Sequence, residues 1–108
     1  MKPLDLKTIK ERSKNIRNVY HELEKHHHGS EWTVEEDALA FLTDAGLVGR
    51  LTMSQQGRWP KGGDANAELE HKLGECIWWI TVLAQRMEID IEEATEKFLS
   101  KTEKLLGK

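Results

Sequence analysis

Two carboxylates have the clearest chemical potential in this sequence, because each interrupts a stretch that is otherwise apolar. Asp44 lies within FLTDAGLV, and Glu75 lies within LGECIWW. Two carboxylates close together in a dry interior repel each other unless they share a proton or a cation lies between them. We therefore expect a divalent cation, Mg²⁺ or Mn²⁺, between these two acids. The alternative is that they pair with Arg50, Lys72 or solvent, as charges on helices usually do.

Two further residues could complete such a metal site. His71 precedes Glu75 by four residues, so both side chains project from the same side of a helix, one turn apart. Glu36 precedes Asp44 by eight residues, or about two helical turns, and could supply another acid. The site that we expect therefore contains Asp44 and Glu75, with His71 and Glu36 near them.

The polar stretch at residues 54–66, SQQGRWPKGGDAN, is the longest loop that we expect. Arg58 and Lys61 could reach phosphate groups, and Trp59 could stack on a nucleobase. The alternative is a solvent-exposed loop with Trp59 folded onto the core. The glycines of this loop do not match a Walker phosphate-binding loop, because no Gly-Lys-Ser/Thr follows at the required spacing.

Other residues that could carry chemistry have simpler interpretations. The only cysteine, Cys76, lies on an apolar helix face, where a thiol behaves as a small hydrophobic group. Residues 26–28 are three adjacent histidines, which point in different directions on a helix and cannot all bind one ion. We interpret them as cationic groups at a helix end that Gly29 terminates.

Hydrophobic periodicity predicts four helices and no strand, which is typical of an all-α four-helix bundle. The first helix is expected over about residues 4–26, with a narrow apolar stripe that suits the outside of a bundle or a partner chain. Thr33 and Glu36 form a capping box that starts the second helix. The third helix spans residues 67–87, and Asp90 caps the fourth.

The same periodicity predicts which faces are buried. On the second helix these are Ala38, Phe41, Leu42, Ala45, Val48 and Thr52, and on the third Leu69, Leu73, Cys76, Ile77, Ile80, Leu83, Ala84 and Met87. The face expected on the fourth helix comprises Ile91, Ala94, Phe98, Leu99, Thr102, Leu105 and Leu106. Gly46 and Gly49 lie inside the second helix, which suggests that another backbone or a ligand approaches closely there.

Composition limits the classes of function. At 108 residues the chain is expected to form a single domain over residues 1–108. Its net charge of -3 gives no electrostatic reason to bind nucleic acid or an anionic membrane. No apolar run approaches the roughly 20 residues that a membrane span requires. The single cysteine suits a reducing compartment, so we expect a cytoplasmic protein.

Three segments carry a family resemblance. Residues 70–78, EHKLGECIW, look like the E-L-[GA]-D-x-[LI]-W helix of the MazG-like, all-α nucleoside triphosphate pyrophosphohydrolases. Residues 89–94, IDIEEA, are similar to that family's entry into its last helix, and residues 42–47, LTDAGL, stand where the family has E-E-x-G-E. The resemblance implies a four-helix bundle completed by dimerisation. It also implies Mg²⁺-dependent cleavage of a (d)NTP to a (d)NMP and pyrophosphate.

The family holds magnesium with four acids, and the matching positions here are Asp44, Leu47, Lys72 and Glu75. The resemblance thus implies that Asp44 and Glu75 bind the metal. Lys72, which replaces an acid, could hold a phosphate in place of a metal, and the loop cations Arg58 and Lys61 could do so as well. Because two of the four acids are replaced, a second hypothesis is a catalytically degenerate relative that binds nucleotide or acts as a protein-interaction module. A third is a helical dimer without a ligand.

Overall fold

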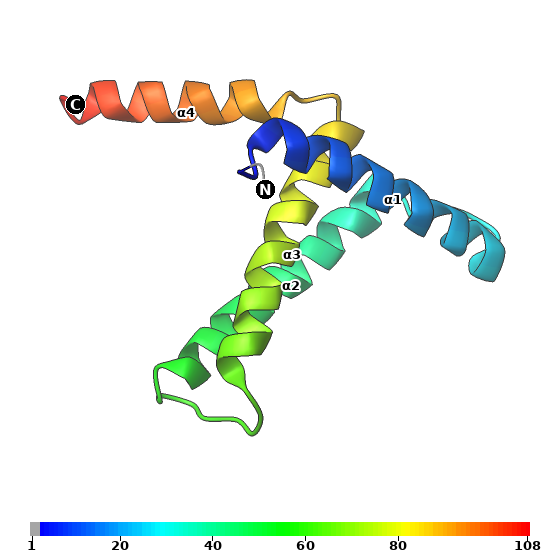
Figure 1. Ribbon diagram of the computed structural model, residues 1–108, viewed down its shortest axis with the longest axis horizontal. Helices are drawn as coiled ribbons and strands as arrows, with labels where there is room; N and C mark the ends of the chain where they lie inside the picture. Colours follow the sequence, from blue (N-terminus) through cyan, green and yellow to red (C-terminus); the bar gives the residue numbers. More distant parts are fainter. Residues whose placement is uncertain (1–2) are drawn as a thin grey trace.

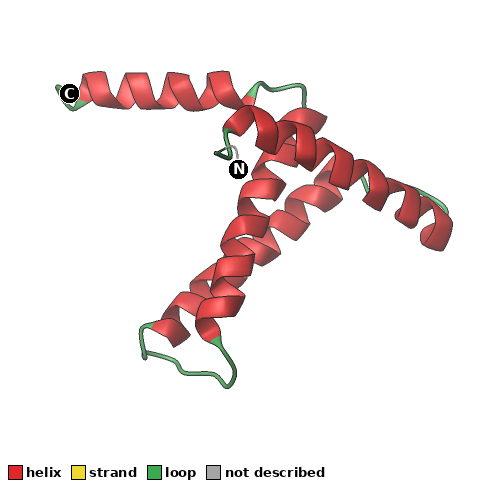
Figure 2. Ribbon diagram, in the orientation of Figure 1, coloured by secondary structure: helices red, strands yellow, loops and turns green. Residues whose placement is uncertain are grey.

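The computed structural model describes residues 3–108 and consists of four α-helices, with no strand in this range (Figures 1 and 2). The helices are α1 (Leu6–His28), α2 (Val34–Gln55), α3 (Ala65–Arg86) and α4 (Ile91–Leu105). None of the helices in this range is long and apolar enough to cross a membrane. The prediction of an all-α chain is confirmed.

The helix ends follow local rules that the sequence displays. Thr33 and Glu36 form the complete capping box that starts α2, and the side chain of Asp90 accepts from two backbone N–H groups at the start of α4. Gly29 ends α1 with φ of 80°, a conformation that a side chain disfavours. Asp5 caps α1 by accepting from the backbone N–H of Thr8, and the helix begins and ends two residues later than predicted.

Three of the helices form the packed part of the molecule, and the fourth extends from it (Figure 1). α2 and α3 run antiparallel as a hairpin, and α1 packs against the part of α3 farthest from the connecting loop. α4 projects away, and ion pairs of Lys10 with Asp90 and Glu92 fix its start to α1. The helices thus bring α2 and α3 together along their length, which positions Asp44 opposite the first half of α3.

The face of α2 that is buried differs from the predicted one. Asp37, Asp44 and Leu51 are its buried residues, spaced seven apart, whereas Leu42 from the predicted face is 65% exposed. Hydrophobic periodicity misses this face because two of its three members are acids. Their burial depends on partners from α1 and α3, which a pattern within one helix does not reveal.

The predicted buried faces of α3 and α4 are also largely exposed in the single chain. α3 buries Trp79, Thr81, Val82 and Ala84, of which the pattern included only Ala84, while Leu73, Ile77, Ile80 and Met87 are exposed. α4 has no buried residue; its side chains Phe98, Leu99 and Leu105 are exposed, and so is Leu106, which follows the helix. These helices carry apolar stripes that the described part of this chain does not cover.

Candidate functional site

Asp44 and Glu75 lie together, as the sequence suggested, and both contact one cation from this chain. The ammonium group of Lys72 donates to Asp44 Oδ1 at 3.0 Å and to Glu75 Oε1 at 2.9 Å. The second oxygen of Asp44 accepts from the indole Nε1 of Trp79 at 2.9 Å. Of the alternatives that the sequence left open, pairing with Lys72 is the one that the structure shows. We call these four residues the Lys72 cluster.

The position of each member follows from helix geometry. Lys72, Glu75 and Trp79 recur at spacings of three and four on α3, so all three lie on the side of that helix that faces α2. Asp44 comes from the middle of α2 and is buried. The lysine therefore crosses the interhelix contact and supplies the positive charge that two neighbouring carboxylates require.

The electrostatics of the cluster favour a charged Lys72 side chain and keep the thiol of the neighbouring Cys76 protonated. Hydrogen bonds from Lys72 to Glu75 and to Asp44 raise the pKa of this lysine above its ordinary value. The pKa of Cys76 is also raised, first by burial and then by the charges of Asp44 and Glu75. A thiol with a raised pKa is a poor nucleophile at neutral pH, which agrees with the structural interpretation of Cys76.

The expected metal ligands do not converge on one point. Within residues 3–108, no group of three or more His, Cys, Asp and Glu side chains lies close enough together to hold a metal ion. The carboxylate of Glu36 accepts from the backbone N–H of Thr33 in the capping box, about 12 Å along the helix from Asp44. His71 is largely exposed, with Nε2 3.7 Å from Glu75 Oε1. This arrangement therefore does not fit Mg²⁺, because the ammonium group of Lys72 occupies the position between the two carboxylates that the metal ion would need.

The loop residues proposed to contact nucleotide are partly engaged with the protein itself. Lys61 forms an ion pair with Glu68 at 2.8 Å. Trp59 is 58% exposed rather than folded onto the core, and the guanidinium of Arg50 lies 3.7 Å from the centre of its ring. Arg50 also donates to the backbone carbonyl of Trp59, while Arg58 is exposed. Arg50 thus covers one face of the indole.

A buried ionic network near α1 was not predicted from the sequence. Asp37 is fully buried and accepts from Arg17 Nη2 at 2.8 Å and from Arg86 Nη1 at 2.8 Å. Arg17 also donates to Glu24, whose carboxylate accepts the backbone N–H of Trp32 at 2.7 Å. The network joins α1, α2 and α3. Its only sequence signal is that Asp37 lies seven residues before Asp44 on one face of α2.

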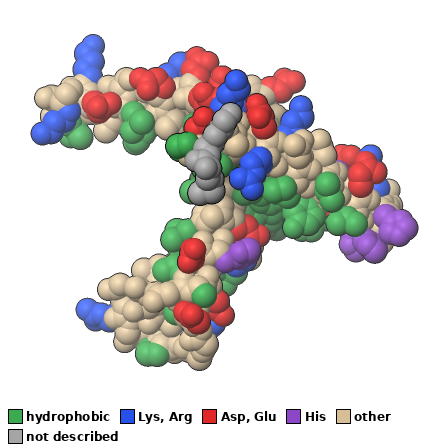
Figure 3. Space-filling model, in the orientation of Figure 1, with side chains coloured by type: hydrophobic (Ala, Val, Ile, Leu, Met, Phe, Trp, Pro, Cys, Tyr) green, Lys and Arg blue, Asp and Glu red, His purple; other side chains and the backbone are tan. Residues whose placement is uncertain are grey.

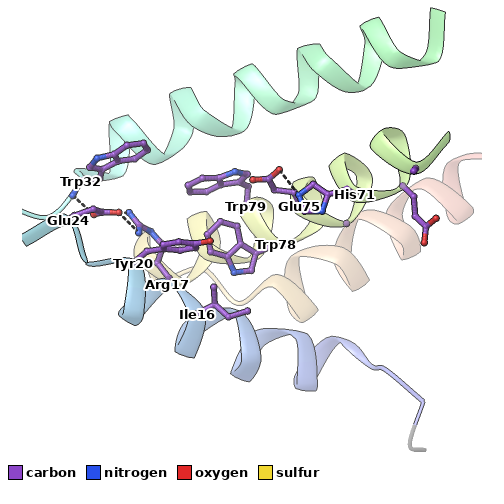
Figure 4. A pocket seen from close by; sticks show the side chains of 12 residues that line it. Ile16, Arg17, Tyr20, Glu24, Trp32, His71, Glu75, Trp78 and Trp79 are labelled. Carbon is purple, nitrogen blue, oxygen red and sulfur yellow. Dashed lines mark hydrogen bonds and ion pairs between the residues drawn. The ribbon is translucent and has the colours of Figure 1, made fainter. Parts of the chain in front are cut away.

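A cleft of about 880 Å³ adjoins both groups of charges, between α1, α3 and the segment that precedes α2 (Figure 4). Its aromatic lining comprises Tyr20, Trp32, Trp78 and Trp79, and its charged lining includes Arg17, Glu24, Glu70 and Glu75. The indole Nε1 of Trp78 is buried and has no hydrogen-bond partner. The volume of the cleft lies within the range of small-molecule sites, but the cleft is open along one side.

Comparisons of the chain with protein-family models, curated proteins and solved structures found no match.

Proposed function

We propose that this chain is a self-associating helical protein of the MazG-like type, in which the acidic pair stabilises the α2–α3 contact instead of binding a catalytic metal. The surface of the chain carries this proposal. A folded single chain of this mass exposes about 6,200 Å², whereas this one exposes 8279 Å². The excess is similar to the area that one subunit of an obligate dimer buries, roughly 1,000–2,500 Å².

The shape and the exposed side chains agree with this interpretation. The radius of gyration is 16.7 Å, against about 13 Å for a compact domain of this length. Figure 3 shows hydrophobic side chains at the surface along α1 and α4 and on the α2–α3 hairpin. Ile77, in the middle of α3, is 53% exposed. Such surfaces are rare on stable monomers and are typical of chains whose core is completed by another chain.

A second copy is the partner that these surfaces suit best. A Cβ atom added at Gly46 or Gly49 would meet nothing within 4 Å, so the close approach expected at these glycines is not made by the chain itself. The uncovered stripe of α3 (Leu73, Ile77 and Ile80) and the outer face of α2 (Leu39, Leu42 and Met53) could pack against their equivalents. Both helices would then bury their apolar sides in one symmetric interface.

The mass of the full chain in solution, measured by light scattering after gel filtration, tests this proposal. We expect at least twice the chain mass of 12.5 kDa. Ile77→Glu places a charge in the uncovered stripe and should produce monomer or loss of folding, whereas Asn66→Glu, on the exposed first turn of α3, should leave the mass unchanged. A wild-type chain that stays folded at 12.5 kDa would contradict the proposal.

Nucleotide pyrophosphohydrolysis is the second candidate, favoured by one observation: Asp44 and Glu75 share a single cation, so two of the family's four acid positions are adjacent. Pyrophosphate release from canonical and modified NTPs and dNTPs, with Mg²⁺ or Mn²⁺, distinguishes the two candidates. We expect no release. Release by the native chain that is lost in Glu75→Gln would establish the hydrolase instead and would assign the metal to this pair.

A further inference from the structure

We propose that α4 of one copy docks in the cleft between α1 and α3 of a second copy, so that two chains exchange this helix. This docking rests on the self-association proposed above and names the surfaces that meet. α4 buries no residue in its own chain, and Phe98 and Leu105 on its apolar stripe are 65% and 77% exposed. Most of the stability of a helix in a protein comes from the surface that covers its apolar stripe.

The fold keeps α4 away from the cleft of its own chain. Ion pairs of Lys10 with Asp90 and Glu92 hold the start of α4 beside the first turns of α1. From there α4 and α1 run in opposite directions (Figure 1). The cleft lies along the later turns of α1, where Ile16 and Tyr20 line it. The stripe of α4 can therefore reach this cleft only on another chain.

The cleft offers an apolar surface to a helix. Ile16 and Tyr20 are exposed on its α1 side. Tyr20 and Trp78 meet edge to face, with ring centroids 5.8 Å apart, and form a continuous apolar wall (Figure 4). On the α3 side, a Cβ atom added at Gly74 would meet nothing within 4 Å, so the backbone is open to close approach. An amphipathic helix in an apolar groove is a recurrent mode of recognition.

The charges of the helix and of the cleft are complementary. Three lysines form a row on one flank of the α4 stripe, at spacings of four and three: Lys97, Lys101 and Lys104. The cleft is lined by the carboxylates of Glu24, Glu70 and Glu75 and by one strong cation, Arg17. Glu70 is exposed and forms no ion pair within residues 3–108. Each exposed pair contributes little energy, but the row decides which flank of α4 faces the acids.

Other places for α4 suit its charges less well. In a symmetric antiparallel pair of α4 helices the same flanks meet, so one lysine row would face the other. An anionic membrane has no attraction for this helix, because four acids outnumber three lysines within Ile91–Leu105. The cleft also adjoins the uncovered stripe of α3, since Glu70 and Gly74 each precede a stripe residue, Leu73 or Ile77, by three positions. The docked helix would thus extend the interface between the copies.

Disulfide formation between two co-expressed full-length chains tests this docking. Both chains carry Cys76→Ala, which removes the native thiol; one also carries Glu70→Cys and the other Lys101→Cys. Both positions are exposed, so each chain keeps its own packing. After oxidation we expect a linked product of twice the chain mass of 12.5 kDa, with the two substituted positions identified by peptide mass spectrometry. In the matched control Glu96→Cys, on the opposite side of α4, replaces Lys101→Cys and should give no link.

The outcomes separate this docking from self-association, which light scattering measures on the same proteins. An oligomer that forms no link between these positions would overturn the docking and leave self-association standing. A link between two Lys101→Cys chains would also overturn it, because α4 would then lie against α4. A folded monomer of 12.5 kDa would remove both proposals.

A substitution on the stripe gives an independent measurement. Phe98 is exposed in the single chain, so Phe98→Ala should leave the fold of the chain intact. We expect it to raise the dissociation constant of the oligomer at least about tenfold, as loss of a buried aromatic anchor does. Glu96→Ala, on the opposite side of the same helix, should leave the constant unchanged. Equal constants for wild type and Phe98→Ala would contradict the docking.

Discussion

Trp79 donates its indole N–H to Asp44 Oδ2 at 2.9 Å across the contact between α2 and α3. Because Asp44 is buried, removal of this donor leaves a carboxylate oxygen without its partner, which costs about 1–3 kcal/mol. We expect Trp79→Phe to lower the free energy of unfolding by at least that amount, measured by urea denaturation. A double-mutant cycle with Asp44→Asn separates the energy of the hydrogen bond from that of lost packing. A coupling energy near zero between Trp79 and Asp44 would show that this hydrogen bond does not stabilise the fold.

Lys72 is the charge that allows Asp44 and Glu75 to lie close together. Lys72→Met should lower the free energy of unfolding at neutral pH by about 1 kcal/mol, because the site is partly exposed and screened. The pKa of Lys72 is raised above 10.5, so its stabilisation is complete below pH 10.5 and is lost as the pH rises through the raised value. The difference between wild type and variant should therefore shrink in alkaline solution. Lys101→Met, on the exposed face of α4, is the matched control.

Asp37 neutralises two arginines from different helices while fully buried. Asp37→Asn removes the negative charge but keeps the shape, and it leaves Arg17 buried with Glu24 as its remaining anionic partner. We expect a loss of about 3–5 kcal/mol in unfolding free energy, measured by chemical denaturation with circular dichroism. Glu93→Gln breaks the exposed pair with Lys97 and should change stability far less, because the pair is solvated and screened. Similar effects of the two substitutions would contradict the structural role of Asp37.

Glu24 should contribute to acid sensitivity. Burial raises its pKa, but hydrogen bonds from Arg17 and from the backbone N–H of Trp32 outweigh burial, so the pKa lies below the ordinary value of 4.5. Its stabilisation is therefore complete above pH 4.5 and is lost as the pH falls through the lowered pKa. In thermal melts from pH 7 to pH 3, the stability gap between wild type and Glu24→Gln should be constant down to about pH 4.5 and then narrow. Glu103→Gln, exposed on α4, should show no such narrowing.

The local structure of this chain could be read from short stretches of sequence. Asp90, Gly29 and the Thr33–Glu36 box end or begin helices where predicted, because capping depends on backbone groups within a few residues. The adjacency of Asp44 and Glu75 also followed from sequence once α2 and α3 were assumed to be antiparallel. The sequence did not identify the cation between them: we expected Mg²⁺ or Mn²⁺, with Arg50, Lys72 or solvent as the alternative, and the structure shows Lys72.

The sequence by itself determined the four helices, the caps that start α2 and α4, the end of α1 at Gly29, and the apolar stripes that the helices carry. Only the tertiary structure decided which stripe is buried. Asp37 lies in the interior because Arg17 on α1 and Arg86 on α3 form ion pairs with it. Leu42 and Ile77 are apolar but remain exposed in the single chain. Periodicity measures the polarity of one helix, but burial of a charge depends on a partner that is distant in sequence, and burial of an apolar stripe depends on a surface to cover it.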